Sequence, residues 1–497
     1  MHLILPKGLD LHALVATYPP SFSSFKVDKL AYILHAVATI PVYTKKSELI
    51  DDYVPLSSII LNTLLGNYKP HLNYAIKMGL LQKHPTIKYQ VGEHCTLYQF
   101  TESYRDFGAV YNLKDFVLRR KLNSFYAKLK ATTDDYKYLN KWFTKKLVID
   151  SDLVLAFLEE EWFLKYSNPH LRDYSIVKQK VKSPFEQYVY SKLSVQFLES
   201  HRYLCKVDSK VNRYHSNLTN MRGLLRNAIT YDGQPMVAVD LSNSQPYLSL
   251  LLLQLDFWEG FLEYLTRSKR QVLKNPENVK NSYKYIWIYM KLEARLRNLE
   301  KDINKYNYLI MLVKMMVSHL ETRDEGVFER YRKEVCQGTL YSYLERVFQG
   351  EDPQRQWTRN DAKIAVLQAF FSDNRFLHSE EALPKRLFKK EFEEVYEVLR
   401  LVKQLHKTLL PILLQNLESL LVLEVIAKRL SKEYPKMPLF SIHDSLVTTV
   451  GHEAVVARII QEELVRYIGF APHLKIEYWK SEELTLHLEQ LKERLRG

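Results

Sequence analysis

The sequence predicts an α+β protein that is mostly helical. Glycine and proline are scarce, with 14 and 18 among 497 residues, and long segments repeat apolar residues with helical periodicity. Only a few short runs rich in β-branched and aromatic residues suit strands, so we expect small sheets. With 46% apolar residues, a chain of this length can bury cores for two or three domains.

The first part of the chain divides into an extension at 1–27, a unit at 28–105 and a helical connector at 106–205. In the unit, the helical runs "LSSIILNTLLG" and "YKPHLNYAIKMGLLQKH" precede two strand-like runs joined by a turn at Gly92. This order is similar to a winged helix, whose second helix usually enters the major groove of DNA. A helical connector with a hairpin, or a winged helix that binds protein, would show the same order.

The composition is basic, with 71 Lys and Arg against 57 Asp and Glu and a net charge of +14. An excess of this size most often marks a polyanionic partner, with nucleic acid ahead of an acidic membrane surface. The 34 tyrosines, some interleaved with cations as in "SYKYIWIYMKLEARLR", suit stacking on bases. Two basic segments, 118–130 and 266–284, are interpreted as solvated surfaces that can contact phosphate. A basic protein without such a partner is the alternative.

The cysteines and the apolar stretches bear on the cellular compartment. Cys95, Cys205 and Cys336 are far apart and fit neither a disulfide framework nor a zinc-ligand spacing, so we expect reduced thiols and a cytoplasmic location. The N-terminus shows no secretory-signal pattern. The leucine-rich stretch 409–427 is interrupted by polar residues and Pro411, and it predicts a buried amphipathic helix with no membrane contact.

Two aspartates at strand-like runs are the first candidates for chemistry. Asp240 ends the run "MVAVD", and Asp444 lies in "MPLFSIHDSLVTTV", between two β-prone runs. Taken singly, each predicts a helix cap or a turn. Strand, hairpin, helix and a further strand can nevertheless form a small antiparallel sheet that carries both carboxylates side by side. Such a pair suits divalent cations, because Mg²⁺ prefers one or two carboxylates plus substrate phosphates, and paired ions support nucleotidyl transfer or nuclease chemistry.

A predicted helix between the two aspartates carries a second set of candidates. In "RNDAKIAVLQAFFS", Arg359, Lys363, Leu367 and Phe371 recur every four residues and share one broad face. The two cations can hold a triphosphate, Arg as a fork and Lys as a point charge, and Phe371 would reach a base or sugar. For this pattern alone, an amphipathic helix with two charges at its edge is the alternative.

These residues, in this order, resemble the motifs of family A DNA polymerases and of the related single-subunit phage-type and mitochondrial RNA polymerases. Asp240-Leu-Ser-Asn-Ser-Gln resembles motif A, Arg-x3-Lys-x3-Leu-x3-Phe resembles motif B, and His443-Asp444-Ser445 resembles motif C. The segment "NRYHSNLTNM", 212–221, is similar to a shortened form of a family A segment that begins with Gly-Arg. The resemblance implies a right-hand polymerase: a palm with a small antiparallel sheet and helical fingers over 206–497, and a thumb-like role for the 106–205 connector.

The resemblance also implies a role for each matching residue. Asp240 and Asp444 would be catalytic and would bind two Mg²⁺ ions, replaceable by Mn²⁺, with the Leu241 carbonyl as an extra ligand. The incoming nucleoside triphosphate would contact four residues: Arg359, Lys363, Phe371 and Gln245. The primer–template DNA would contact four others: Arg213, Asn217, Asn220 and His443.

The chain departs from the family at positions that govern sugar choice. Five residues after the motif A aspartate, the DNA polymerases carry Glu, whose bulk blocks a ribose 2′-hydroxyl, and the RNA polymerases carry Gly. Gln245 at this position is nearly isosteric with Glu. The RNA polymerases use a motif B Tyr hydroxyl near the ribose, which Phe371 lacks, whereas Ser445 ends motif C as in those RNA enzymes. Phe371-Ser372 replaces the usual Tyr-Gly. We predict deoxynucleotide use.

The expected activity is therefore template-directed extension of a 3′-hydroxyl with dNTPs. No acidic cluster before residue 206 resembles the Asp-x-Glu of proofreading exonucleases, so we expect no 3′→5′ editing. One alternative is an RNA polymerase or primase of the same superfamily. Another is a non-catalytic replication-initiator or DNA-binding protein, which would bind DNA without synthesis.

Overall fold

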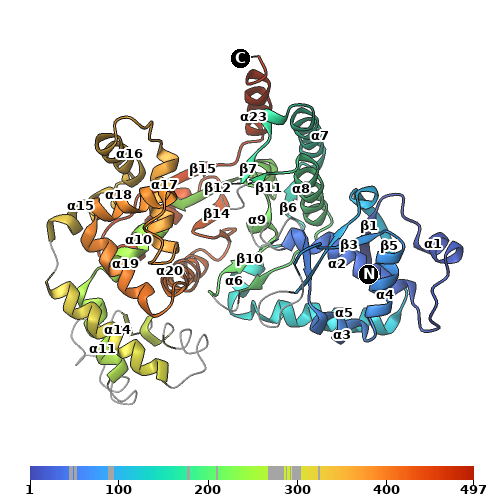
Figure 1. Ribbon diagram of the computed structural model, residues 1–497, viewed down its shortest axis with the longest axis horizontal. Coiled ribbons are helices and arrows are strands. Elements are labelled where there is room, and N and C mark those ends of the chain that lie inside the picture. The colour runs from blue at the N-terminus through green and yellow to red at the C-terminus, as the bar shows by residue number, and fades with distance from the viewer. Residues whose placement is uncertain are drawn as a thin grey trace. The chain divides into compact units, whose positions relative to one another are not determined.

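The computed structural model describes residues 1–43, 49, 53–87, 95–175, 180–208, 211–266, 285–286, 288–290, 293, 304–322 and 325–496. Within these residues the fold is mostly helical α+β with small antiparallel sheets, as the sequence predicts (Figure 1). The chain forms two compact units. Unit 1 joins Met1–Lys206, His215–Met236 and Tyr478–Gly497, and unit 2 joins Val207–Tyr214 and Val237–Glu477. The predicted Gly92 turn and nearly all of the basic segment 266–284 lie outside the described residues.

Unit 1 is built from helices and short strands (Figure 1). The helices are α1 (Leu11–Thr17), α2 (Val27–Tyr43), α3 (Ser58–Leu65), α4 (Lys69–Lys77), α5 (Phe116–Ala131), α6 (Lys137–Asn140), α7 (Ser151–Ser167), α8 (Pro184–Glu199), α9 (Asn217–Asn220) and α23 (Glu482–Glu493). The strands are β1 (His2–Pro6), β2 (Val54–Leu56), β3 (Leu81–Lys83), β4 (Thr96–Phe100), β5 (Phe107–Asn112), β6 (Leu147–Ile149), β7 (Tyr174–Ser175), β8 (Lys180–Val181) and β11 (Ile229–Tyr231). The strands β9 (Lys206–Val207), β10 (Tyr214–His215) and β12 (Gln234–Leu241) run across the boundaries of the two units.

The region predicted as a winged helix contains nearly all of the long helix α2, the two short helices α3 and α4, and a three-stranded antiparallel sheet of order β2-β4-β3. The helix α3 begins where the Ser57 side chain accepts a hydrogen bond from the Ile60 backbone N–H, and it ends at Gly66, whose φ of 68° suits glycine. The next helix, α4, ends just before Gly79, as predicted. The DNA-binding role of this region stays a prediction.

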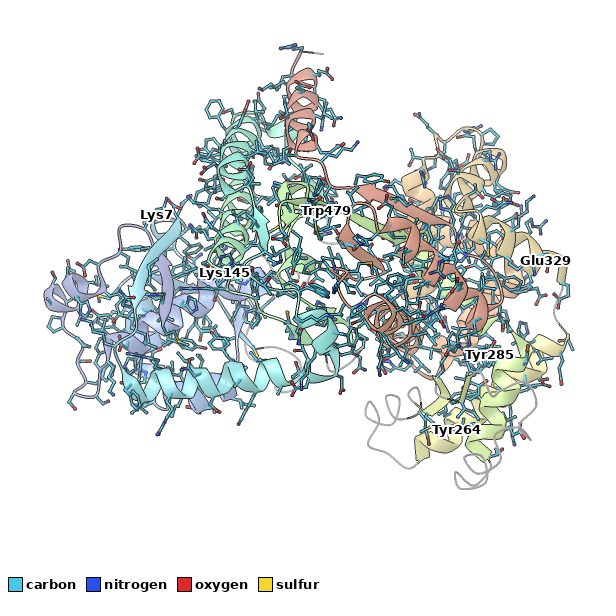
Figure 2. The ribbon with its side chains drawn as sticks, turned by 180° about the vertical axis from the view of Figure 1, so that it is seen from behind. Lys7, Lys145, Tyr264, Tyr285, Glu329 and Trp479 are labelled. Atoms are coloured by element: carbon cyan, nitrogen blue, oxygen red, sulfur yellow. The ribbon has the colours of Figure 1, made fainter. Side chains whose placement is uncertain are left out.

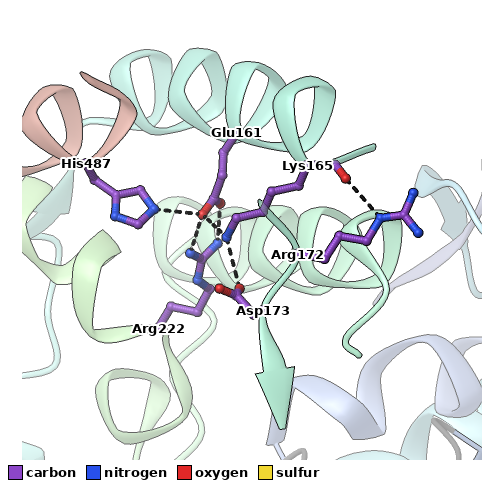
Figure 3. A network of polar contacts seen from close by, with 6 residues as sticks. All are labelled: Glu161, Lys165, Arg172, Asp173, Arg222 and His487. Carbon is purple, nitrogen blue, oxygen red and sulfur yellow. Dashed lines mark hydrogen bonds and ion pairs between the residues drawn. The ribbon is translucent and has the colours of Figure 1, made fainter. Parts of the chain in front are cut away.

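A buried ionic network holds α7 to α23 and to the segment after α9 (Figure 3). Glu161 accepts hydrogen bonds from Arg222 at 2.7 and 2.9 Å, from Lys165 at 2.9 Å and from His487 at 3.2 Å. Lys165 also pairs with Asp173 at 2.9 Å. Burial would raise the pKa of Glu161, but the bonds from His487 and Arg222 and the charge of Lys165 hold it well below its usual range.

Replacing Glu161 by Gln is expected to lower the free energy of unfolding of unit 1 by about 3–5 kcal/mol at pH 7, because buried cations lose their carboxylate. A carboxyl with a lowered folded-state pKa stabilises above its unfolded pKa and loses that contribution as the pH falls through the folded value. The difference between wild type and Glu161→Gln should therefore shrink below about pH 4.5. Urea unfolding measured across pH checks this. The control, Glu160→Gln, removes only the exposed Lys492 ion pair and should cost under about 1 kcal/mol. Equal losses in the two variants would contradict the assignment.

Unit 2 contains most of the other helices and the remaining strands. The helices are α10 (Ser244–Leu252), α11 (Leu255–Thr266), α14 (Asn304–Glu321), α15 (Glu325–Cys336), α16 (Leu340–Glu351), α17 (Arg359–Phe371), α18 (Leu383–Glu391), α19 (Glu393–Leu405), α20 (Leu409–Ser419), the π-helical segment Leu420–Ala427, α21 (Lys428–Glu433) and α22 (Glu453–Ile468). The strands are β13 (Phe440–Ile442), β14 (Ser445–Thr449) and β15 (Leu474–Tyr478), of which only the last residue, Tyr478, belongs to unit 1. In sheet order, β13 pairs with β14, which lies beside β12, and β15 also pairs with β12.

The core of unit 2 is apolar and partly aromatic. Figure 2 labels Tyr264 and Tyr285, which belong to an aromatic cluster; its other rings are Phe257, Trp258, Phe261 and Tyr289. The continuous helix Leu409–Glu433 is long and apolar enough to cross a membrane, but 67% of its most apolar window is buried inside the fold. It packs against α10, α19 and α22, as a core helix does. This placement agrees with the predicted buried helix.

The helix α17 is fixed at both ends. At its start, the Thr358 side chain accepts a hydrogen bond from the Asp361 N–H, and the Asp361 carboxylate accepts one in return from the Thr358 N–H. At its end, the buried Lys403 donates to the Ala369 carbonyl, and the buried Lys385 donates to the Ser372 hydroxyl at 3.0 Å. Cations at a helix C-terminus satisfy carbonyls that have no partner within the helix. The exposed face of α17 is therefore presented on a well-anchored helix.

Candidate functional site

The first aspartate lies at the end of a buried strand. In β12, Val237 and Val239 are fully buried, and Asp240 is half-buried one residue before the strand ends at Leu241. Asn243, at the start of α10, has a φ of 53°, in the left-handed region that non-glycine residues rarely adopt. Such backbone is concentrated at functional sites, where the surrounding fold enforces it.

The second aspartate lies in a two-residue turn. Ile442 pairs with Ser445, so His443 and Asp444 alone connect β13 to β14. His443 has a φ of 56°, as the first turn residue of a tight hairpin often requires. The Ser445 hydroxyl donates a hydrogen bond to Asp240 Oδ1, which joins the hairpin to the end of β12. The two aspartates, 204 residues apart in the chain, thus meet on one sheet.

The electrostatics of the pair match two carboxylates held close together. Burial, followed by the charge of Asp444, raises the pKa of Asp240, while the Ser445 hydrogen bond opposes this. Burial, followed by the charge of Glu418, raises the pKa of Asp444. Both shifts mean that the fold disfavours two bare negative charges here. A bound cation would relieve that repulsion.

The donor set fits Mg²⁺ better than a transition metal. Among the residues that the structure describes, no group of three or more His, Cys, Asp or Glu side chains could hold a metal ion by itself. The pair Asp240 and Asp444 offers two carboxylates and no imidazole or thiolate. Mg²⁺ is commonly held by one or two carboxylates together with substrate phosphates and water, so these residues fit it.

The cationic face of α17 belongs to the same region of unit 2. Arg359, Lys363 and Leu367 are exposed, and within the described part of the chain neither cation forms an ion pair. Lys363 Nζ lies 5.8 Å from the centre of the Tyr341 ring. Burial raises the pKa of Tyr341; the charge of Arg359 lowers this pKa and the charge of Asp444 raises it, both by smaller amounts. Tyr341 therefore lies close enough to Arg359 and Asp444 for both charges to shift its pKa.

Gln245, predicted to select the sugar, and Arg213, a predicted primer contact, share one buried hydrogen-bond partner. Glu418, only 2% exposed on α20, accepts two hydrogen bonds from Arg213, at 2.9 and 2.8 Å, and a third from the Gln245 amide. Gln245 Oε1 is buried and has no hydrogen-bond partner in the described structure. Asn212 and Val211 also bond to α20, through Asn416 and Ser419. Arg213 and Gln245 are thus fixed beside Asp444 through one carboxylate.

Two predicted primer contacts, Asn217 and Asn220, belong to unit 1. The Asn217 amide accepts from the Leu204 N–H at 2.8 Å and donates to the Arg202 carbonyl at 3.0 Å, and Asn220 donates to the Ser216 carbonyl. The amide of Asn217 is therefore used to hold the local backbone.

Phe371 and Leu241 are the last residues of two elements that carry the site, α17 and β12. Phe371 is the half-buried last residue of α17, with its ring centre 6.1 Å from that of Phe370. Leu241 is the buried last residue of β12. Their nucleotide and metal contacts stay predictions, as does a template contact of His443.

Sequence reasoning missed four residues around the site. Glu418 was visible only as a polar interruption of a leucine-rich helix, and no sequence pattern singled out Tyr341. The lysines that hold the end of α17, Lys385 and Lys403, were not singled out by any sequence pattern. A lone charged residue within an apolar helix was the one available signal, because such residues are rarely buried without a partner.

Comparison with known proteins adds a weak similarity. No protein family matches the chain, and no curated protein matches its sequence. Among solved structures, the chain is similar to the POL domain of Pol1 from M. smegmatis, solved in complex with DNA primer-template and dNTP. The identity is 11% and the TM-score is 0.34, over 75% of this chain and 74% of that one.

Proposed function

We propose that the chain is a nucleotidyl transferase that extends a 3′-hydroxyl on a template, with dNTPs as substrates. The observation that carries the proposal is the meeting of Asp240 and Asp444 on one small antiparallel sheet, with the unpaired α17 cations near them in the same unit. Two carboxylates with a facing pair of cations are what a magnesium-bound triphosphate needs. A helix cap or a turn residue would explain either aspartate alone but not their meeting.

Each residue of this chain has a distinct task in the proposal. Asp240 and Asp444 would hold the metal ions, which would supply activation of the 3′-hydroxyl and neutralisation of charge on the leaving pyrophosphate. Arg359 and Lys363 bind the triphosphate and orient it. Ser445 fixes the rotamer of Asp240 by its hydrogen bond. Glu418 holds Arg213 and Gln245 beside the nucleotide site.

Primer extension tests the proposal. The purified protein is incubated with Mg²⁺ and a labelled primer on a DNA template, with dNTPs or rNTPs supplied separately. We expect extension with dNTPs. Extension that prefers rNTPs would favour the RNA polymerase or primase alternative. Binding to DNA without synthesis on primed DNA, primed RNA or bare template would contradict the proposal and favour a DNA-binding protein.

Sugar selection is expected to depend on the bulk of Gln245. Replacing Gln245 by Gly should lower the dNTP over rNTP preference by about tenfold to hundredfold, the equivalent of the roughly 1–3 kcal/mol that a buried hydroxyl without a partner costs. Replacing it by Leu keeps the bulk but removes the bond to Glu418, and this variant should keep the preference. Steady-state incorporation of matched dNTP and rNTP measures the ratio. An unchanged ratio in Gln245→Gly would show that another residue selects the sugar.

A further inference from the structure

A cavity of about 770 Å³ lies within unit 1, among residues to which the proposed function gives no role. It is lined from β1, α2, α5 and the segment after α8. Its volume falls in the range of about 300–1,000 Å³ that is typical of small-ligand sites. The cavity is therefore large enough for a nucleotide-sized molecule.

The charged side chains that line the cavity are cationic. They are Arg119 and Arg202, and three histidines, His2, His35 and His201, lie in the same lining. None of the described residues that line the cavity is an Asp or Glu. A cavity that gathers guanidinium groups without a carboxylate favours an anionic occupant.

The two arginines have donors to spare. The Arg202 side chain forms no ion pair or hydrogen bond with any described residue, although Asn217 fixes its backbone carbonyl at 3.0 Å. Arg119 donates from Nη2 to the Leu113 carbonyl at 3.2 Å, but its Nε is buried and has no partner in the described structure. A buried guanidinium N–H without an acceptor is costly, so a ligand acceptor at this place would be stabilising.

His35 adds a third donor from a buried position. Its side chain is only 7% exposed, and Nδ1 accepts a hydrogen bond from the Ile4 backbone N–H at 3.0 Å. Burial, followed by the charge of Arg202, lowers the pKa of His35 to about 4, so the ring is neutral near pH 7. With Nδ1 as acceptor, the single proton is on Nε2. No described residue accepts from that N–H.

Aromatic side chains supply the rest of the wall. Tyr126, Phe143 and Tyr203 line the cavity, and the ring centres of Phe143 and Tyr203 are 5.6 Å apart. The Tyr203 hydroxyl donates to the Thr144 carbonyl at 2.6 Å, which holds this ring in place. Aromatic faces beside cations are the combination that binds bases together with phosphate.

We infer that this cavity binds a phosphomonoester attached to a nucleoside, with Arg119, Arg202 and His35 donating to the phosphate and the aromatic wall contacting the base. A free nucleotide and the 5′-phosphorylated end of a nucleic acid strand share this chemistry. The inference does not depend on the proposed function, because it uses only residues of unit 1.

Two pairs of probes test the inference on the full-length protein. The first pair is dAMP and deoxyadenosine, compared by calorimetry. The second is a 3′-labelled oligodeoxynucleotide with either a 5′-phosphate or a 5′-hydroxyl, compared by fluorescence anisotropy. We expect dAMP to bind and deoxyadenosine not to bind if the ligand is a free nucleotide. If the ligand is a strand end, the phosphorylated oligonucleotide should bind about tenfold to hundredfold tighter than its counterpart.

Substitutions in the lining test whether the binding occurs in the cavity. Arg202→Gln and Arg119→Gln should each lower the phosphate-dependent affinity by at least about tenfold. Arg120→Gln, on the same helix as Arg119 but outside the cavity lining, should leave that affinity unchanged. The Arg202 side chain has no ion pair or hydrogen bond in the described structure and contacts only the Phe197 ring, at 6.0 Å, so Arg202→Gln should change the thermal unfolding midpoint little. Arg359→Ala, in unit 2, should retain the binding even if it lacks polymerase activity.

Three results would overturn the inference that the cavity binds a phosphate group. If neither phosphorylated probe binds better than its unphosphorylated counterpart, the cavity is no phosphate site. If phosphate-dependent binding survives intact in folded Arg202→Gln and Arg119→Gln, the phosphate binds elsewhere. Loss of that binding in Arg359→Ala would assign it to the proposed nucleotide site in unit 2 and overturn the inference.

Discussion

Replacing Asp240 or Asp444 by Asn is expected to reduce primer extension by about a thousandfold or more. Metal ions in such sites stabilise several kcal/mol of transition-state charge, and each 1.36 kcal/mol corresponds to a factor of about ten in rate. Asn keeps the size of the side chain but lacks the charge that holds the metal. Steady-state and single-turnover extension with Mg²⁺ measure the loss.

The thermal stability of Asp240→Asn and Asp444→Asn distinguishes a metal-binding role of these residues from a structural one. Burial raises the pKa of both carboxyls, assisted by the charge of Asp444 at Asp240 and by the charge of Glu418 at Asp444, so each charge is unfavourable in the fold without metal. Neutralising one of them should leave the thermal unfolding midpoint unchanged or raise it. If Asp240 were only a turn residue or a cap, Asp240→Asn would lower the midpoint and leave activity intact.

A matched control uses an aspartate in a turn outside the site. Asp232 lies in the turn before β12 and forms an exposed ion pair with Lys146 at 2.6 Å. Asp232→Asn should change neither extension nor stability by more than a small amount, because exposed ion pairs contribute about 0–1 kcal/mol. Comparable loss of extension in Asp232→Asn would indicate a general effect of charge on DNA binding.

Local patterns in the sequence predicted the elements that carry the site. The run ending at Asp240 forms β12, the stretch from Arg359 forms α17 with the predicted shared face, and the His443-Asp444 pair forms a two-residue turn. Each of these depends on periodicity, capping or turn chemistry within about a dozen residues. The mostly helical α+β class followed from the same local signals.

The partners of the site residues could not be predicted, because they are distant in the chain. The hydrogen bond between Arg213 and Glu418 joins residues 205 positions apart, and that between Lys403 and Ala369 joins residues 34 apart. One sequence contains no signal of such pairing. For the same reason the short segment 212–221 gave no sign that it crosses from unit 2 into unit 1, so Arg213 lies with Asp444 while Asn217 holds the backbone beside the cavity.

Neutralising the cations of α17 is expected to weaken nucleotide use by about tenfold to hundredfold for each residue. A hydrogen bond to a charged group contributes roughly 1.5–3 kcal/mol, and within the described structure Arg359 and Lys363 have no carboxylate partner that competes for them. Arg359→Gln and Lys363→Gln should therefore raise the KM for dNTP or lower kcat, while affinity for primed DNA changes little. Incorporation of a single matched dNTP at varied concentration gives both constants.

Because α17 is anchored at both ends, a loss of nucleotide use in Arg359→Gln or Lys363→Gln would reflect the lost charge and not a disturbed helix. Both side chains are exposed on a helix whose ends are held by Thr358 and by the buried Lys385 and Lys403, so their truncation should not disturb the fold. Arg346→Gln, which removes an exposed cation from the neighbouring α16, is the control and should incorporate dNTP normally. If all three variants lose dNTP affinity equally, the effect belongs to the overall positive charge. If Arg359→Gln and Lys363→Gln behave as wild type, α17 is an amphipathic helix with two charges at its edge, and the triphosphate must bind elsewhere.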